Sequence, residues 1–338
     1  MVTTSPAHTQ RTASAHHPPV AARAAGIVVA ITAALAILAI AFALPAVHSG
    51  PHEVPIGAAG PTAAGGQVTG MLEQKAPGAF AVTYYPGQDA LADAIRHREV
   101  YGGIALPSQP GRRATLLIAS GGSPAVAQLL GQLGNQISQR TGTPLQTEDL
   151  APLPARDPRG AGLAASALPI TLAGILPAVA LVLALRREVW TRFAAAVVFS
   201  GAAGLTIAAL LRYVLGSVDQ NFWGVTGGLT LGVAAATLTV LGLGSLFGRA
   251  GLAIGAVLAL LVGNPLSGLN SAPEMLPAGW GQLGQLLPQG ATATVLRSTA
   301  AFDGAGATSA IVVLSCWALT GIALIVIAGL RRPKQLPQ

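Results

Sequence analysis

The stretch AGLAIGAVLALLVGNP, residues 250–265, has the composition of a membrane span that ends too early. Residues 250–263 are apolar or small, and as a helix they would extend about 21 Å, whereas the hydrocarbon core of a bilayer is about 30 Å thick. A longer helix would have to pass through Asn264-Pro265, where proline removes a backbone donor. The sequence therefore predicts a broken helix. We expect the break to open toward the outer water, with Ser267 accessible there.

The segment after the break is predicted to form two short interfacial helices. In the first, the apolar side chains share one helical face: Leu276, Trp280, Leu283 and Leu287. The second runs from Ala291 to Phe302, with Arg297 long enough to reach lipid headgroups. Together they predict a re-entrant outer segment, 264–306, whose candidate gate residues are Asn264, Pro265, Trp280 and Arg297. The alternative is an ordinary extracytoplasmic loop that contains some leucines.

The composition is that of a membrane protein. Hydrophobic residues make up 52% of the chain and charged residues only 9%, against about 25% charged in soluble proteins. The net charge of +7 comes from scattered cations without a basic stripe, so we expect no nucleic-acid partner. Cys316 is the single cysteine, and His48, His52 and Glu53 lie together only in a flank of the first span. We therefore expect no cofactor and no metal site.

Residues 1–163 divide into three predicted parts. Residues 1–24 are predicted to be a disordered cytoplasmic tail, and 25–47 an uncleaved first transmembrane helix. Residues 48–163 hold eight of the 12 acidic residues and are predicted to be a small extracytoplasmic α/β domain. Its predicted strands are 54–58, 80–85, 103–106 and 115–119, and its predicted helices are 89–100 and one that Ser123 caps and that ends near Gly142.

Residues 164–331 are predicted to be a five-helix transmembrane bundle, followed by a cytoplasmic tail, 332–338. The long apolar runs are 164–185, 193–211, 223–247 and 308–330, and the broken span supplies the fifth. The predicted fold is thus a membrane all-α bundle of six transmembrane helices with the α/β domain inserted between the first and second. Alternating the sides gathers these basic residues on one face against Glu188 alone: Arg11, Arg23, Arg186, Arg187, Arg192, Arg249, Arg331, Arg332 and Lys334. Positive residues mark the cytoplasmic side, so we expect both termini in the cytoplasm and the chain in the plasma membrane.

The motifs of energy conversion and catalysis are absent from the sequence. Neither lysine follows a glycine, so a phosphate-binding loop cannot form, and no H-E-x-x-H or G-x-S-x-G occurs. The predicted spans carry hydroxyls but no ionisable group at membrane depth that would bind a coupling ion. We expect a protein that is not an enzyme, and energy for any transport must come from another subunit.

Two further sets of residues are candidates for contacts. Gly224, Gly228 and Gly232 repeat at intervals of four and predict a close helix-packing face, either inside one bundle or as the seam of a homodimer. Arg186, Arg187 and Arg192 lie in the short loop between the second and third spans, and they are the candidate cytoplasmic docking residues.

Four stretches resemble those of actinobacterial membrane proteins related to type-two ABC exporter permeases and the phage infection protein group. They are REVYGGI at 98–104, PLPARDPRG at 152–160, GNPLSG at 263–268 and RSTAAFDG at 297–304. The resemblance implies six helices per subunit, an outer insertion after the first helix and re-entrant helices before the last. It carries no substrate-binding residues over to this chain, and the loop 186–192 is a short docking surface for an ATPase.

Two functions follow as expectations. The first is a permease-like subunit of an ABC-type exporter, which moves a hydrophobic or envelope-related compound with energy from a separate ATPase. The alternative is a non-transporting cell-envelope protein whose outer domain binds a partner or supports surface assembly. The expected partners are the lipid bilayer, the ATPase and a second copy of the chain.

Overall fold

The computed structural model describes residues 20–107, 113–141 and 145–331. The chain falls into two compact units, residues 1–41 and 42–338. Helix α1 (Val20–Val47) forms the described part of the first unit and ends in the second. It begins five residues before the predicted span, so residues 20–24 are helical and the prediction of a disordered tail up to residue 24 was wrong for them. The remainder of that tail and residues 332–338 lie outside the described residues.

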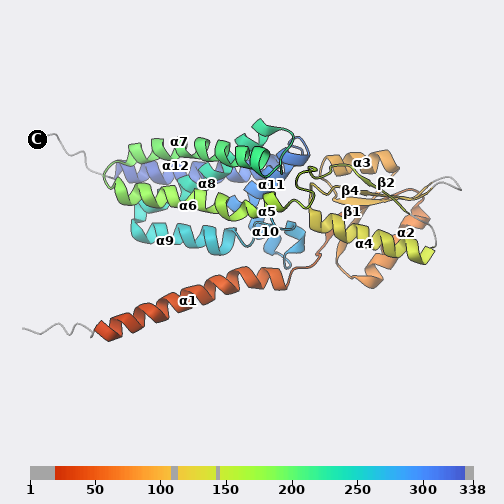
Figure 1. Ribbon diagram of the computed structural model, residues 1–338, viewed down its shortest axis with the longest axis horizontal. Helices are drawn as coiled ribbons and strands as arrows, with labels where there is room; N and C mark the ends of the chain where they lie inside the picture. Colours follow the sequence, from red (N-terminus) through yellow and green to blue (C-terminus); the bar gives the residue numbers. More distant parts are fainter. Residues whose placement is uncertain (1–19, 108–112, 142–144, 332–338) are drawn as a thin grey trace, which may run out of the picture. The chain divides into compact units, whose positions relative to one another are not determined.

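The α/β domain is built on a five-stranded mixed sheet (Figure 1). Its strands are β1 (Val54–Ala59), β2 (Phe80–Tyr85), β3 (Gly102–Ala105), β4 (Thr115–Ile118) and β5 (Gln146–Asp149), in the order β2-β1-β3-β4-β5. Strand β1 is parallel to β2 and β3, β4 is antiparallel to β3, and β5 is parallel to β4. The helices are α2 (Thr62–Lys75), α3 (Gln88–Arg96) and α4 (Pro124–Thr141).

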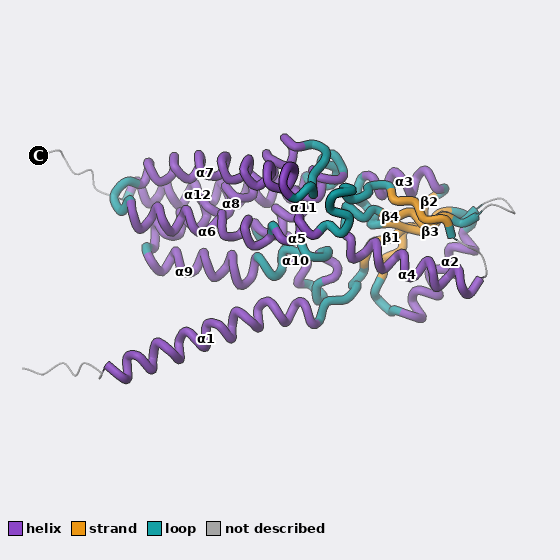
Figure 2. The backbone as a smooth tube through the Cα atoms, viewed as in Figure 1, coloured by secondary structure: helices purple, strands orange, loops and turns teal. Residues whose placement is uncertain are grey.

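The two faces of this sheet have separate cores, because successive side chains of a strand point to opposite faces. Leu116 packs with Val126 and Leu130 of α4, whereas Leu117 packs with Leu91 and Ile95 of α3. Figure 2 shows the strands between these helices. The four predicted strands and the two predicted helices are confirmed within a few residues, and Ser123 accepts a hydrogen bond from Val126 N as the predicted cap. Strand β5 and helix α2 were not predicted.

The second part of the larger unit is a helical bundle. Its elements are α5 (Ala161–Ala165), α6 (Ala167–Ala184), α7 (Val189–Ala209), the π-helix η1 (Leu210–Val214), α8 (Phe222–Phe247), α9 (Arg249–Val257), the π-helix η2 (Leu258–Gly263), the 3-10 helix η3 (Pro273–Met275), α10 (Trp280–Gln285), α11 (Pro288–Ala301) and α12 (Thr308–Leu330). Helix α8 is the central one, because it packs against α6, α7, α9, α11 and α12.

Among the described residues, five helical stretches are long and apolar enough to cross a bilayer: 20–47, 161–184, 189–214, 222–247 and 308–330. The outer helices expose large apolar side chains, such as Val198 on α7 and Leu319 on α12, as lipid-facing surfaces do. This is the pattern of a multi-pass membrane protein. The predicted sixth span corresponds to the shorter apolar helix Arg249–Gly263, formed by α9 and η2.

The bundle has two distinct ends. At the end next to the α/β domain, Ser217 beyond η1 donates to Asp157, and Asn221 before α8 donates to Asp303 before α12. At the opposite end, the start of α7 lies against the end of α12, where Trp190 is the nearest side chain to Gly329. After η2 the chain is again at the domain end, because Ser271 O accepts from Ser123 Oγ of the domain at 2.8 Å. The segment α9–η2 therefore carries the chain from one end of the bundle to the other.

The prediction of a helix that stops at Asn264-Pro265 is confirmed, since η2 ends at Gly263. The predictions for the segment that follows were partly wrong. Ser267 is only 4% exposed, so the break is buried in protein and does not open to water. Helix α11 is not interfacial either: residues 288–293 and 295–299 are all buried, most of them small, and the helix packs against α8 and α12.

Candidate functional site

A cavity of about 720 Å³ lies where the α/β domain meets the segment between η2 and α12. Its walls come from the start of β1, from the turn between α3 and β3, from η3 and α10, and from α11 with the loop that follows it. Its size falls within the range of about 300–1,000 Å³ that is usual for small-molecule sites. The cavity is therefore the candidate binding site of the described chain.

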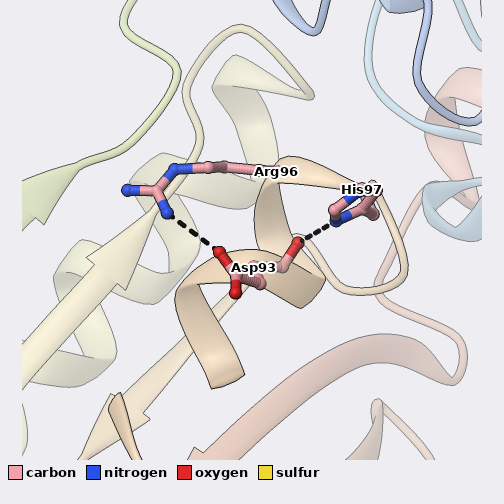
Figure 3. Close-up of polar contacts among 3 residues, drawn as sticks. All are labelled: Asp93, Arg96 and His97. Atoms are coloured by element: carbon pink, nitrogen blue, oxygen red, sulfur yellow. Dashed lines mark hydrogen bonds and ion pairs between the residues drawn. The ribbon is translucent and has the colours of Figure 1, made fainter. Parts of the chain in front are cut away.

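The turn after α3 positions the first charged wall residue, Arg98. Figure 3 shows the end of this helix, where Arg96 Nη1 lies 3.1 Å from Asp93 Oδ1 and His97 Nδ1 lies 2.8 Å from the Asp93 carbonyl oxygen. Arg98 then adopts φ +62°, a left-handed conformation that is uncommon for a residue with a Cβ. This conformation turns the chain away from the helix axis and toward α11.

The Arg98 side chain joins the domain to α11. Its Nη1 donates to the Thr294 carbonyl oxygen at 3.2 Å and to Ser298 Oγ, and its guanidinium lies 5.4 Å from the centre of the Phe302 ring. Burial lowers the pKa of Arg98 from its ordinary value, although nearby Tyr101 and Glu274 oppose the shift. The guanidinium keeps its charge at neutral pH because its ordinary pKa is so high.

The second charged wall residue is Glu274, on η3. Its Oε2 accepts a hydrogen bond of 2.8 Å from the Tyr101 hydroxyl. Burial, followed by the negative charge of Glu274, raises the pKa of Tyr101 above its ordinary value, so the phenol remains a donor. His52 N also donates to the Glu274 carbonyl oxygen at 2.9 Å. Glu274 is thus held by the domain through both its side chain and its backbone.

Two of the four predicted gate residues, Asn264 and Arg297, are buried in contacts inside the protein. Arg297 is 3% exposed, and its Nη2 donates to the carbonyl oxygens of Gly268, Leu269 and Ser271, at 2.6, 2.7 and 3.0 Å. It therefore holds the loop after the break and does not reach headgroups. Asn264 is 8% exposed and accepts from Thr171 Oγ1 of α6 at 3.2 Å. Pro265 follows the end of η2, and the half-buried Trp280 begins α10 between two cavity-lining glycines, Gly279 and Gly281.

The glycine face is used inside the chain. A Cβ added at Gly228 would lie 2.5 Å from Val295 Cγ1, and one at Gly232 would overlap the side chain of Thr292. Both neighbours are on α11, so the prediction of close helix packing is confirmed for these two positions. A Cβ at Gly224 would meet Asn221, the residue that caps α8. Since α11 covers this face, it is not available as the seam of a homodimer.

The predicted docking arginines divide into two groups. Arg186 and Arg187 are exposed in the turn between α6 and α7. Arg192 is only 1% exposed, and it donates to the carbonyl oxygens of Leu185 and Arg186, each at 2.5 Å, and to Ser245 Oγ at 3.3 Å. Arg192 therefore caps the end of α6 and ties it to α8, so its assignment as a docking residue was wrong.

The sequence interpretation missed the cavity residues Arg98, Tyr101 and Glu274. One signal was available: Glu274 is the single acidic residue between Asp219 and Asp303, in a stretch that is otherwise apolar. Among the described residues, no group of histidine, cysteine, aspartate and glutamate side chains is arranged to hold a metal ion. No family model, no curated protein and no solved structure matches this chain.

Proposed function

We propose that this chain is the permease-like membrane subunit of an ABC-type exporter, and that a separate ATPase supplies the energy. The observation that carries the proposal is the path of residues 249–301. A short helix ends inside the bundle, and the chain returns through the cavity wall as a buried helix, α11, that packs on the central helix α8. The same segment therefore lines a binding cavity on the outer side and packs inside the bundle.

The distribution of charge supports an external energy source. In the five candidate spans, aspartate, glutamate, histidine, lysine and arginine are represented only by Arg23, Arg192 and Arg212, each within four residues of an end of its span. Ion-driven transporters bind the coupling ion through ionisable or polar groups near the middle of the membrane. Hydroxyls in the middle of these helices instead donate to backbone carbonyl oxygens, as Ser200 of α7 does to Ala196 and Thr239 of α8 does to Ala235.

The proposed topology has six crossings of the plasma membrane with both termini in the cytoplasm. It follows if α9–η2, which joins the two ends of the bundle, counts as a crossing. The helix is shorter than the roughly 30 Å core, but its end is covered by α11 and by the buried segment after Gly263, so its last turn need not meet lipid. The ATPase would then dock at the end that holds Arg186, Arg187 and Glu188.

Co-purification tests this function. We expect the tagged full-length chain, extracted from its native membranes in mild detergent, to bring along an ATPase subunit that mass spectrometry identifies and that hydrolyses ATP. The double variant Arg186→Gln/Arg187→Gln should lose it at an unchanged level of inserted protein. The matched control is Arg156→Gln/Arg159→Gln, two exposed arginines next to the outer domain. Transport against a gradient by the chain alone in liposomes would overturn the proposal.

A second candidate function is a non-transporting envelope protein that binds its ligand in the outer cavity. The small pocket beside Asn264, inside the bundle, favours it, because this pocket has a volume of about 10 Å³, roughly that of one water. Beside Asn264, the described bundle therefore leaves room for no more than about one water molecule. Recovery of ligand-bound chain without any ATPase, under conditions that preserve other transporter complexes, would favour this second function.

A further inference from the structure

Two opposite charges line the cavity without pairing with each other. Arg98 and Glu274 are both wall residues, and the charge of Glu274 acts on Arg98 to raise its pKa against the effect of burial. The structure nevertheless contains, among its described residues, a single ion pair within 4.0 Å, and that pair is Arg96 with Asp93. A cation and an anion that share a half-buried cavity ordinarily lower their energy by direct contact. Here the fold holds them apart.

Each of these charges also has hydrogen-bonding capacity to spare. The guanidinium of Arg98 uses Nη1, and within the described part of the chain its other N–H groups meet no acceptor. Glu274 accepts from Tyr101 through Oε2, and Oε1 receives no donor from the described residues. No polar side-chain atom that is fully buried in the described structure lacks a partner, so these free atoms reach solvent. Both residues line the cavity.

The rest of the wall carries a second carboxylate, the exposed Glu53, together with the His52 ring, neutral amides and apolar surface. Val100, Leu276 and Phe302 contribute apolar surface, and Gln282 and Gln285 contribute amides. The two glutamines are on α10, and the same short helix and its cap carry Leu283 and Leu286, each 60% exposed. A polar group inside the cavity and an apolar chain along α10 would therefore both find matching surfaces.

We propose that this cavity binds the zwitterionic head of an amphiphile, with a phosphate on Arg98 and an ammonium on Glu274. A phosphate gains charge-assisted hydrogen bonds from the free N–H groups of Arg98, and an ammonium donates to the free oxygen of Glu274. An anion alone is repelled by Glu274 and by the exposed Glu53, and a cation alone leaves the free N–H groups of Arg98 without an acceptor. A phosphoethanolamine group satisfies both residues, and the exposed leucines of α10 favour a phospholipid as its source.

This inference deepens the proposed function and rests on it only where the bound lipid is taken to be the transported compound. The binding itself needs no ATPase. The full-length chain, purified in detergent, is titrated with short-chain phosphatidylethanolamine, with phosphatidylglycerol of the same chain length and with free phosphoethanolamine. We expect phosphatidylethanolamine to bind at least about tenfold more tightly than phosphatidylglycerol. Free phosphoethanolamine competing as strongly as the lipid would assign the site to a soluble zwitterion and overturn the lipid source.

Two variants separate recognition from folding. Arg98→Gln should weaken binding of phosphatidylethanolamine about tenfold, because it removes the partner of the phosphate. Glu274→Gln should weaken it similarly but improve binding of phosphatidylglycerol, a reversal of preference that simple misfolding would not produce. The matched controls are Arg96→Gln and Glu99→Gln, exposed residues that flank the same turn and do not line the cavity.

The outcomes decide the proposal independently of transport. Equal binding of the two lipids by the unchanged protein, or equal weakening by the control variants, would refute the zwitterion site. If the selectivity is observed but no ATPase co-purifies, the binding site stands and the exporter function fails. If an ATPase co-purifies but neither lipid nor free phosphoethanolamine binds, the exporter function stands and the zwitterion site fails.

Discussion

Backbone carbonyl oxygens, rather than carboxylates, hold four arginines of this chain. Arg297 donates to three backbone carbonyl oxygens and Arg192 to two. Arg98 and Arg212 each donate to one. A buried guanidinium is costly unless its donors are satisfied. With only 12 acidic residues in 338, the chain uses backbone carbonyl oxygens as acceptors, most of them near the ends of helices or in loops. Each such arginine holds in place the backbone segment whose carbonyl oxygen it binds.

The roles of Arg192 and Arg297 could not be predicted from the sequence. Positive charge near the end of an apolar run is typical of a cytoplasmic or headgroup position, and both residues fit that pattern. Their burial is decided by partners distant along the chain: Ser245 of α8 for Arg192, and the loop 268–271 for Arg297. A side chain that bonds to a distant backbone leaves no local pattern in the sequence.

Asp157 provides a pH-dependent test. Burial opposes its ionisation, but hydrogen bonds from Ser217 Oγ and from the backbone N–H groups of residues 160–162 outweigh it and hold the pKa of Asp157 below its ordinary value of 3.8. Because the folded pKa is depressed, the stabilisation is present above about pH 4 and is lost as the pH falls through the folded pKa.

We expect Asp157→Asn to unfold at a lower temperature at pH 7, because the amide accepts these bonds less well than the carboxylate. The difference in unfolding temperature between this variant and the unchanged protein should become smaller below pH 4. Thermal unfolding in detergent between pH 7 and pH 3 measures this, with the exposed Asp93→Asn as the control. A difference in unfolding temperature that stays constant from pH 7 to pH 3 would contradict the depressed pKa of Asp157.

Elements whose side chains alternate or repeat were predictable, and elements that depend on a partner were not. Strand β2 and helix α12 have the predicted bounds, because a period of two and an unbroken apolar run are local features. Strand β5, QTED, is polar, and it exists because its backbone pairs with β4 at the edge of the sheet. Helix α2 contains three glycines among its 14 residues, which weakens any helical signal.

The environment of helix α11 also depends on a partner helix, and the sequence did not identify that partner. Most of residues 291–301, ATATVLRSTAA, are small or polar. The sequence predicts an interfacial helix there, with Val295 and Phe302 on its apolar side and Arg297 reaching the headgroups. In a membrane bundle, small residues instead allow two helices to approach closely, and α11 packs this way on Gly228 and Gly232 of α8. The glycine spacing was visible in the sequence, but the helix that fills it was not.

We expect Gly228→Ala to destabilise the bundle, because its Cβ would lie 2.5 Å from Val295 Cγ1. Overpacking of this kind costs about 1–3 kcal/mol. Gly227→Ala is the matched control, since no atom lies within 4 Å of its Cβ and alanine is the better helix former. The apparent unfolding temperature in detergent should fall for Gly228→Ala and hold or rise for Gly227→Ala. Similar values for the two variants would mean that α8 and α11 are not in close contact.

In the larger unit, the cavity lies at the end of the apolar bundle that meets the α/β domain. The α/β domain contributes Arg98, Tyr101 and Ser123 to contacts with the segment between η2 and α12. The overall plan of bundle plus inserted domain was predictable from hydropathy and the clustering of acidic residues. The cavity was not, because its walls come from parts of the chain that are far apart in the sequence, from residue 52 to residue 306.

The short helix α9–η2 decides the topology of the whole chain. With the N-terminus in the cytoplasm, as proposed, a crossing by this helix would place the C-terminus in the cytoplasm. Without that crossing, α12 would start on the inner side and the C-terminus would lie outside. The proposed crossing rests on the path of the chain: α8 ends at one end of the bundle, the segment after η2 contacts the α/β domain at the other, and α12 begins beside Arg98. The tight turn at Gly248, with φ +63°, reverses the chain between α8 and α9.

Reporter fusions measure this directly. We expect a reporter that is active only outside the cytoplasm to be active when it is fused after residue 121 or 285, and a cytoplasmic reporter to be active after residue 189 or 334. The fusion after residue 248 is the internal control, because it reports the inner side whether or not α9–η2 crosses. The fusions after residues 285 and 334 then exchange sides if the helix fails to cross. An inner signal at 285 together with an outer signal at 334 would leave five crossings and remove the cavity from the outer side, and with it the proposed site of lipid binding.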